Sequence, residues 1–312
     1  MELIHKKTNI DFIGMRKYTF AFSGSLIILS ILSFIFVGLN LGIDFAGGIL
    51  IQLRFPAPVK IQDIRSMAAP LGYGELVIQE FGSSEEVIVR VVERRIEGDM
   101  VQSELVAKLT QALQPLAANG KIEVRRVEYV GPQVGKELTW KGLMAVFYSL
   151  FAILAYVGWR FEFRFALGAV IALFHDVVIT VGFFSFTHRE FTLVVVAAVL
   201  TIIGYSINDT IVVFDRIRET MKRLKKQPLP IIINAAVNET LSRTIITSLT
   251  VVLVLLSLLL VGGEVIRDFS LALFIGVVIG TYSSIFVASP IVILLEKRGA
   301  PSSPPLVEKK HV

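Results

Sequence analysis

The sequence contains no cysteine and has little charge for its length. Of 312 residues, 18% are charged and 54% are hydrophobic. Without cysteine there can be no disulfide bonds, thiolate nucleophiles, cysteine-bound zinc or iron–sulfur clusters. A soluble domain has about 25% charged and about 45–50% apolar residues. The composition therefore excludes a cytosolic enzyme, a secreted disulfide scaffold and a disordered chain.

The apolar excess is concentrated in long uninterrupted runs, and the mean hydropathy is +0.70. The first run, residues 18–39, has 22 residues and would make about 33 Å of helix, enough to cross a hydrocarbon core of about 30 Å. It is longer than a signal-peptide core and lacks a cleavage site, so we expect a retained helix. Residues 138–295 hold five further runs, at 138–157, 165–186, 191–214, 244–261 and 269–295. With the first run, this predicts six transmembrane helices.

Residues 44–137 form a more polar segment with a different periodicity. Alternating apolar residues predict strands, and apolar residues three or four apart predict helices. The predicted order is strand, helix, strand, strand, helix, strand, which is typical of a ferredoxin-like α+β domain. The predicted strands are 47–55, 75–81, 86–92 and 121–130, and the predicted helices are 59–71 and 99–118.

Basic residues alternate between the loops and predict how the chain crosses the membrane. They cluster in the second and fourth connections and after the last apolar run, whereas the third and fifth connections have one arginine each. By the positive-inside rule, both termini, residues 1–17 and 296–312, lie in the cytoplasm, and domain 44–137 lies outside. The net charge of +5 then reflects topology, and no nucleic-acid binding is expected. The polar, proline-rich tail at 296–312 is predicted to be disordered.

Asp209 lies inside the fourth apolar run. It precedes Arg216 by seven residues, which places it about 10 Å inside the basic boundary. Thr201, Tyr205 and Asp209 recur every four residues and Asn208 is adjacent, so we expect these supporting polar groups near the carboxyl. Intramembrane carboxylates usually serve a function, which makes Asp209 a candidate proton carrier. The alternative is a carboxylate near the helix end that reaches water or binds a neighbour.

Arg243 begins the fifth apolar run, and Glu239 and Thr247 lie four residues before and after it. We expect Arg243 and Asp209 toward the cytoplasmic side of adjacent helices. Because a guanidinium keeps its proton, Arg243 would act as a fixed charge that favours ionised Asp209 when close and releases it when distant. The alternative is an arginine that extends to lipid phosphate.

His175 and Asp176 lie near the middle of the third run. One histidine and one aspartate are too few for a convincing metal site, so no metal is expected. A proton relay and a structural buried hydrogen bond remain alternatives.

The sixth run carries small residues at every fourth position, including Gly276, Gly280 and Ser284, which predicts a helix-packing face. The glycine-rich segments 42–48 and 130–135 lack nucleotide-binding spacing, so no cofactor is expected.

Several of these segments resemble the SecF family of the bacterial Sec protein-export machinery. The two long motifs are the most specific, and the likeness covers nearly the whole chain. The similar segments are GIDFAGG (42–48), VGPQVG (130–135), FHD (174–176), SINDTIVVFDRIRE (206–219) and NETLSRTIITSLT (238–250).

The resemblance implies more than the residues alone predict. A SecF protein is similar to one half of a resistance-nodulation-division transporter, and SecD supplies the other half. The pair associates with the SecYEG channel and YajC in the inner membrane, and acts after the SecA ATPase. It uses the proton motive force, with H⁺ or in some cases Na⁺ as coupling ion, to promote translocation and release of preproteins. The resemblance assigns proton conduction to Asp209 and Arg243.

Two other functions fit the same sequence. One is half of a small-molecule exporter of the resistance-nodulation-division superfamily, which would need a second external domain and a substrate cleft. The other is a scaffold that stabilises the SecYEG complex without transporting anything, in which case the intramembrane charges would be dispensable.

Overall fold

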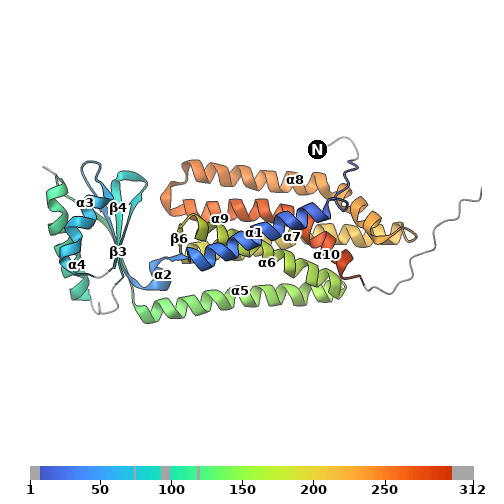
Figure 1. Cartoon of the computed structure of the whole chain (residues 1–312), viewed down its shortest axis with the longest axis horizontal. Coiled ribbons are helices and arrows are strands. Elements are labelled where there is room, and N and C mark those ends of the chain that lie inside the picture. Colours follow the sequence, from blue (N-terminus) through green and yellow to red (C-terminus); the bar gives the residue numbers. More distant parts are fainter. Residues whose placement is uncertain (1–7, 74, 93–98, 118–119, 297–312) are drawn as a thin grey trace, which may run out of the picture.

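The computed structural model describes residues 8–73, 75–92, 99–117 and 120–296. Figure 1 shows an elongated molecule in which a long helix bundle carries a small sheet domain at one end. Except for residue 296, the tail predicted to be disordered lies outside the described residues.

Within the described residues, six helices are long and apolar enough to cross a membrane, which confirms the prediction of a polytopic helical membrane protein. The last of them, Ile266–Leu294, combines most of α9 with a π-helical turn, η3, and the short α10. The bounds are α1 Arg16–Phe36, α5 Pro132–Arg160, α6 Phe163–Phe186, α7 Leu193–Arg223, α8 Leu229–Val261, α9 Gly263–Ser283, η3 Ser284–Ala288 and α10 Ser289–Leu294.

Two helices extend well beyond their apolar runs. α7 continues past Phe214 to Arg223, and α8 begins at Leu229, directly after Pro228. Proline is suited to a helix start because its missing N–H would have no intrahelical partner there. The apolar runs marked the membrane-embedded part of each helix, whereas the helices themselves continue as amphipathic ends.

The polar first part of α8 holds the N-terminal segment. The Asn234 Oδ1 accepts hydrogen bonds from the backbone N–H groups of Phe12 and Ile13, at 2.9 and 3.3 Å. The Asn238 side chain both accepts from the Ile10 N–H and donates to its carbonyl, at 2.9 and 2.8 Å. These two asparagines therefore fix the chain before α1, and Phe12 and Ile13 are buried in the bundle core.

Residues 48–130 form the sheet domain, in which the element order is the predicted one. Its four strands are all antiparallel to their neighbours, in the order β3-β4-β2-β5. Each helix ends in a 3₁₀ turn that contains a proline, Pro70 or Pro115. The bounds are β2 Gly48–Arg54, α3 Ile61–Ala68, η1 Ala69–Leu71, β3 Glu75–Phe81, β4 Ser83–Val92, α4 Asp99–Leu113, η2 Gln114–Ala117 and β5 Glu123–Val130.

Alternation along the strands explains the core of the sheet domain. Ile49, Ile51 and Leu53 of β2 are 0% exposed and belong to one cluster with Ile64 of α3 and Leu109 of α4. Because successive strand residues point to opposite faces, these three side chains share one face. Both helices therefore cover that face, and the opposite face looks toward the helix bundle (Figure 1).

The hairpin between β3 and β4 is tighter than the sequence predicted. β4 begins at Ser83, within the predicted loop 82–85. Gly82 alone separates the strands and has φ +75°. Glycine accepts this left-handed conformation without steric cost, so Gly82 makes the turn and the polar residues after it join the strand.

A short connecting layer joins the sheet domain to the bundle. β1 (Asn40–Leu41) follows α1 and pairs in parallel with β6 (Glu190–Phe191), which precedes α7. The next turn, α2 (Ile43–Ala46), packs on the start of α5 so closely that a Cβ on Gly135 would lie 2.9 Å from the Phe45 carbonyl oxygen. The two glycine-rich segments therefore form the structural connection between the two parts of the chain.

Candidate functional site

Asp209 is buried at the α7–α8 contact with only part of its hydrogen-bonding capacity used. The side chain is 9% exposed. Its Oδ1 accepts a hydrogen bond from the Thr244 hydroxyl of α8 at 2.7 Å. Its Oδ2 is buried and has no hydrogen-bond partner among the described residues. A buried carboxylate oxygen without a donor is costly, whereas a protonated carboxyl is neutral, so this site is suited to gaining and losing a proton.

Arg243 lies one residue before Thr244 on α8 but makes no ion pair with Asp209 within the described residues. Its side chain is exposed on the surface of the chain, as is that of Thr247. The direct partner of the carboxyl is Thr244. Thr244 was not predicted, although its position inside the NETLSRTIITSLT motif could have signalled it.

Among the described residues, no hydrogen bond joins the Asp209 carboxyl to the predicted supporting residues of α7, Thr201, Tyr205 and Asn208. Thr201 and Asn208 are exposed and Tyr205 is half-buried, whereas Asp209 is buried. Four residues of an α-helix turn through about 400°, so a stripe with a spacing of four drifts by about 40° at each step. Thr201 therefore lies well round the helix from Asp209, and its hydroxyl donates to the Ala197 carbonyl of its own helix at 2.8 Å.

Glu239 belongs to a separate ionic cluster. Its carboxylate oxygens accept from Arg216, at 2.6 Å, and from Arg223, both on α7. Glu239 thus connects the ends of α7 and α8 beyond the apolar runs and is not a partner of Asp209.

Asp176 is the second buried carboxylate, and it is fully hydrogen-bonded. It is 0% exposed. Its Oδ2 accepts from the hydroxyls of Ser206 on α7, at 2.7 Å, and Ser283 on α9, at 2.8 Å. Its Oδ1 lies 2.9 Å from Nδ1 of His175. Asp176 therefore joins three helices.

His175 is 2% exposed and stacks on Tyr282, with ring centroids 6.3 Å apart. Its Nε2 is buried and has no hydrogen-bond partner among the described residues. The Tyr282 hydroxyl donates to the Thr19 carbonyl at 2.9 Å and lies 3.1 Å from the Ser23 hydroxyl, which carries the polar contacts on to α1.

The end of α9 and the π turn connect the surroundings of the two carboxylates. Ser283 contacts Asp176, and the hydroxyl of the next residue, Ser284, lies 2.9 Å from that of Thr210, which follows Asp209. The sequence predicted Ser284 as a packing residue only; the structure gives it a polar contact as well.

Gly276 and Gly280 lie where α9 packs on α7. A Cβ on Gly276 would lie 2.3 Å from Cδ1 of Ile202, and one on Gly280 would lie 3.0 Å from the Ser206 hydroxyl. The small residues thus bring α9 close enough for Ser283 and Ser284 to reach the polar groups of α6 and α7.

Beside the Asp209 contact, α7 and α8 present a polar face that no described residue of the chain covers. On α8, the exposed residues Arg243, Thr247 and Thr250 follow one another along the helix, and on α7, Thr201 and Asn208 are exposed. Arginine at membrane depth is expensive unless it is paired or reaches water.

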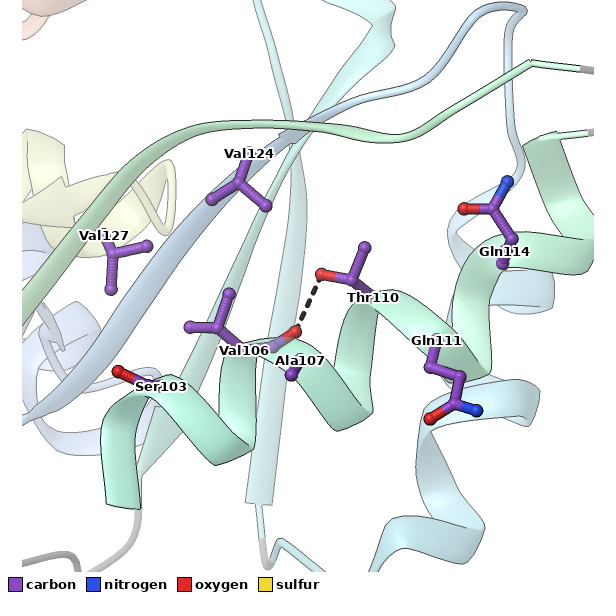
Figure 2. A pocket seen from close by; sticks show the side chains of 8 residues that line it. All are labelled: Ser103, Val106, Ala107, Thr110, Gln111, Gln114, Val124 and Val127. Atoms are coloured by element: carbon purple, nitrogen blue, oxygen red, sulfur yellow. Dashed lines mark hydrogen bonds between the residues drawn. The ribbon is translucent and has the colours of Figure 1, made fainter. Parts of the chain in front are cut away.

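The sheet domain has an open groove of different character. It has a volume of about 720 Å³ and lies between α4 and the edge strand β5. Figure 2 shows small apolar and neutral polar side chains around it, including Val106, Val124 and Thr110, whose hydroxyl donates to the Val106 carbonyl at 2.7 Å. Its lining contains no ionisable side chain, so this groove offers no group that could carry a proton.

The fold and the buried carboxylates define a polytopic membrane protein whose polar core joins several helices. The family model for the C-terminal part of the protein export membrane proteins SecD and SecF matches residues 109–298, and that for the SecD/SecF GG motif matches residues 32–59. The chain belongs to the SecD/SecF family and groups with its SecF members.

Individual relatives agree with this assignment. The chain is 58% identical to protein translocase subunit SecF of Magnetococcus marinus, over 95% of both chains. It is 49% identical to SecF of Calditerrivibrio nitroreducens, over 95% of this chain and 97% of the relative. The crystal structure of SecDF, a translocon-associated membrane protein of Thermus thermophilus, is 38% identical and aligns with a TM-score of 0.85 over 96% of this chain, which spans 40% of that longer protein.

Proposed function

We propose that this chain is an accessory subunit of Sec protein translocation that works with a SecD-like partner. Together they use the proton motive force to promote translocation of preproteins and their release on the outer side. The high identity to SecF proteins over nearly the whole chain supports the role. The match to 40% of a SecDF protein supports a partner that supplies the remainder. The role is transport rather than catalysis, and it needs no cofactor or metal.

The uncovered polar face of α7 and α8 supports the same partnership. Arg243 and Thr247 are exposed on the surface of the chain, and Arg243 begins the apolar run of α8, where a charged side chain is costly unless it is paired or reaches water. A second helix bundle packed there would cover both residues. It would also enclose the Asp209 contact within a two-subunit interface.

We further propose a location in the bacterial inner membrane with both termini in the cytoplasm. The ionic cluster of Arg216, Arg223 and Glu239 then lies at the cytoplasmic side, as the positive-inside rule requires. The sheet domain, with its ferredoxin-like strand order, lies outside. SecYEG, YajC and, indirectly, SecA are the expected partners on the basis of family membership.

The buried, unpartnered Oδ2 of Asp209 is the observation that carries the mechanism. Protonation would neutralise the carboxyl and let the α7–α8 contact close around a neutral group, and ionisation would favour an arrangement that brings a cation or water near. One charge crossing 100 mV provides about 2.3 kcal/mol. That is enough to shift the populations of two helix arrangements substantially.

The test is Asp209→Asn, which keeps the shape of the side chain and removes its titration. We expect loss of the export that depends on the proton motive force, measured as accumulation of a reporter protein in the periplasm of cells or in the lumen of inverted vesicles, with the complex still assembled. Asp215→Asn is the matched control, because Asp215 lies on the same helix, is exposed and pairs with Arg160 at 3.6 Å.

Two results would contradict the proposal. Normal export by Asp209→Asn with assembly intact would favour the scaffold function. Drug efflux in place of protein export would favour the exporter. Repeating the assay with Na⁺ at fixed pH identifies the coupling ion, which we expect to be H⁺.

A further inference from the structure

Arg90 is a buried arginine that connects the sheet domain to the helix bundle. It lies in β4 and is 6% exposed, although arginine is almost never fully buried unless it is paired. Its Nη1 donates to the Leu41 carbonyl at 2.6 Å and to Glu190 Oε1 at 3.2 Å. Its Nη2 donates to Asn40 Oδ1 at 3.0 Å. All these acceptors belong to β1 and β6, outside the sheet domain.

Glu190 is held from two strands of the sheet domain. Its Oε1 accepts from Arg90 on β4, and its Oε2 accepts from the Gln79 side chain on β3 at 3.1 Å. The side chains of the Arg90–Glu190 pair are 7% and 14% exposed. Water and salt screen a buried pair far less than a surface pair. Because the two groups are also hydrogen-bonded, the contact fixes their relative orientation as well as pairing their charges.

The acceptors of Arg90 lie at the ends of the helices that carry the candidate site. Glu190 comes shortly before α7, the helix of Asp209, and β1 follows α1. Backbone contacts fix β1 and β6 to each other, and the Gly42 N–H donates to the Phe191 carbonyl at 2.9 Å. The Asp44 carboxylate accepts from the N–H of Leu193, the first residue of α7, at 2.9 Å.

We infer that Arg90 and Glu190 form a buried ionic joint that sets the orientation of the sheet domain on the outer ends of α1 and α7. Through this joint, a displacement of α7 turns the domain instead of being absorbed by a flexible linker. Arg90 and Glu190 are positioning residues. The role of the joint in transmitting movement of α7 rests on the proposed function. Its effect on the orientation of the sheet domain does not, and can be tested separately.

Because this chain has no cysteine, introduced cysteines are its only attachment sites for spin labels, and any cysteines of the partner are replaced beforehand. One label replaces Gln62, exposed on α3, and the other replaces Lys141, exposed on α5. Distances between the labels are measured by pulsed electron resonance on the full chain with its SecD-like partner in lipid. The variants are Arg90→Met and Glu190→Gln. The matched control is Arg126→Gln, which breaks the exposed Arg126–Glu128 pair on the same sheet.

We expect one narrow distance distribution in the parent and in Arg126→Gln. Arg90→Met and Glu190→Gln should each broaden it. Because the two residues act as a unit, the double variant should broaden it no more than Arg90→Met alone. A second label pair, at Gln62 and Gln111 within the sheet domain, should keep its distance in every variant, which separates reorientation of the domain from its unfolding.

An unchanged Gln62–Lys141 distribution in Arg90→Met overturns the joint. So does a broadening of the Gln62–Gln111 distribution as large as that of the Gln62–Lys141 distribution, because the domain itself would then have unfolded. Either result leaves the Asp209 mechanism untouched. Conversely, if Asp209→Asn exports normally while Arg90→Met reorients the domain, the joint stands and the proton mechanism fails. If the joint and the proton mechanism both hold, proton-driven export should fall in Arg90→Met while the reporter still reaches the complex.

Discussion

At the scale of single residues, one hydroxyl decides how the Asp209 carboxyl is held. The Thr244 side chain donates to Oδ1 at 2.7 Å, and Oδ2 has no partner among the described residues. We therefore expect the α8 hydroxyl to tune the proton affinity of Asp209, while the exposed Arg243 acts from the side that a partner would cover.

Thr244→Val tests this role, because it keeps the shape of the side chain and removes its donor. We expect proton-driven export between that of the parent and that of Asp209→Asn. The ionised carboxyl would lose its hydrogen bond from α8, and hydrogen bonds to charged groups contribute about 1.5–3 kcal/mol. The pH at which export is half-maximal should shift as well, since the bond favours the ionised form.

Thr240→Val is the control, because Thr240 is also a buried threonine of α8 and, among the described residues, its hydroxyl donates to the backbone carbonyls of Ala236 and Val237 in its own helix. If both valine variants lower export equally, the contact with Asp209 is not the reason. An unchanged pH profile in Thr244→Val would contradict the tuning role.

The sequence identified the buried carboxylate Asp209 itself, but not the side chains that contact it. A lone aspartate in an apolar run marks Asp209 because charge at depth is costly. Its partner Thr244 depends on how α7 and α8 rotate against each other, which one sequence does not specify. A spacing of four places Tyr205 within about 40° of Asp209 but Thr201 about 80° round the helix, so the pattern alone ranks Tyr205 as the nearer companion of Asp209.

At the scale of elements, the close approach of α9 to α7 places the polar core. Gly276 leaves no room for a methyl group, because a Cβ would lie 2.3 Å from Cδ1 of Ile202. Ile202 is 1% exposed and is enclosed on all sides.

Gly276→Ala should therefore lower the stability of the bundle by about 1–3 kcal/mol, the usual cost of overpacking, even though alanine is the better helix former. The measurement is thermal unfolding of the purified complex in detergent. Gly24→Ala is the control, since a Cβ on Gly24 of α1 meets nothing within 4 Å.

The double variant Gly276→Ala/Ile202→Ala should lose less stability than the sum of the two single variants, because Ile202→Ala removes the atoms that clash. A loss in the double variant that equals the sum of the single losses would show that the clash is not the cause.

The elements themselves were largely predictable. Six apolar runs and one strand–helix alternation led to the observed helices and sheet, since burial in lipid and in a two-layer core both leave strong periodic signals. Element ends were less predictable. α8 begins at Leu229 rather than near residue 244, because amphipathic residues continue the helix after the membrane ends.

At the scale of the whole molecule, we expect a SecD-like subunit to pack on the polar face of α7 and α8 and to shield it from lipid. A nitroxide at Thr247 should be accessible to oxygen in lipid when the chain is expressed alone, and protected when a SecD-like subunit is present. Oxygen concentrates in lipid, so its collisions with the label report contact with acyl chains.

A nitroxide at Leu249 is the control, because Leu249 is also exposed but lies on nearly the opposite side of α8. Its accessibility should stay the same with and without the partner. Equal protection at both positions would indicate aggregation, and protection at neither would place the partner elsewhere.

The π turn Ser284–Ala288 has a consequence for how related sequences are compared. A π turn holds one residue more than the α-helical hydrogen bonding accommodates, and the wider turn absorbs that residue locally. Removing one residue there would restore a regular helix and leave α10 near its present neighbours, whereas the same deletion within α9 would rotate everything after it by about 100°. A one-residue gap at this turn is therefore compatible with the same packing of α9 and α10, and a gap within α9 would indicate a different one.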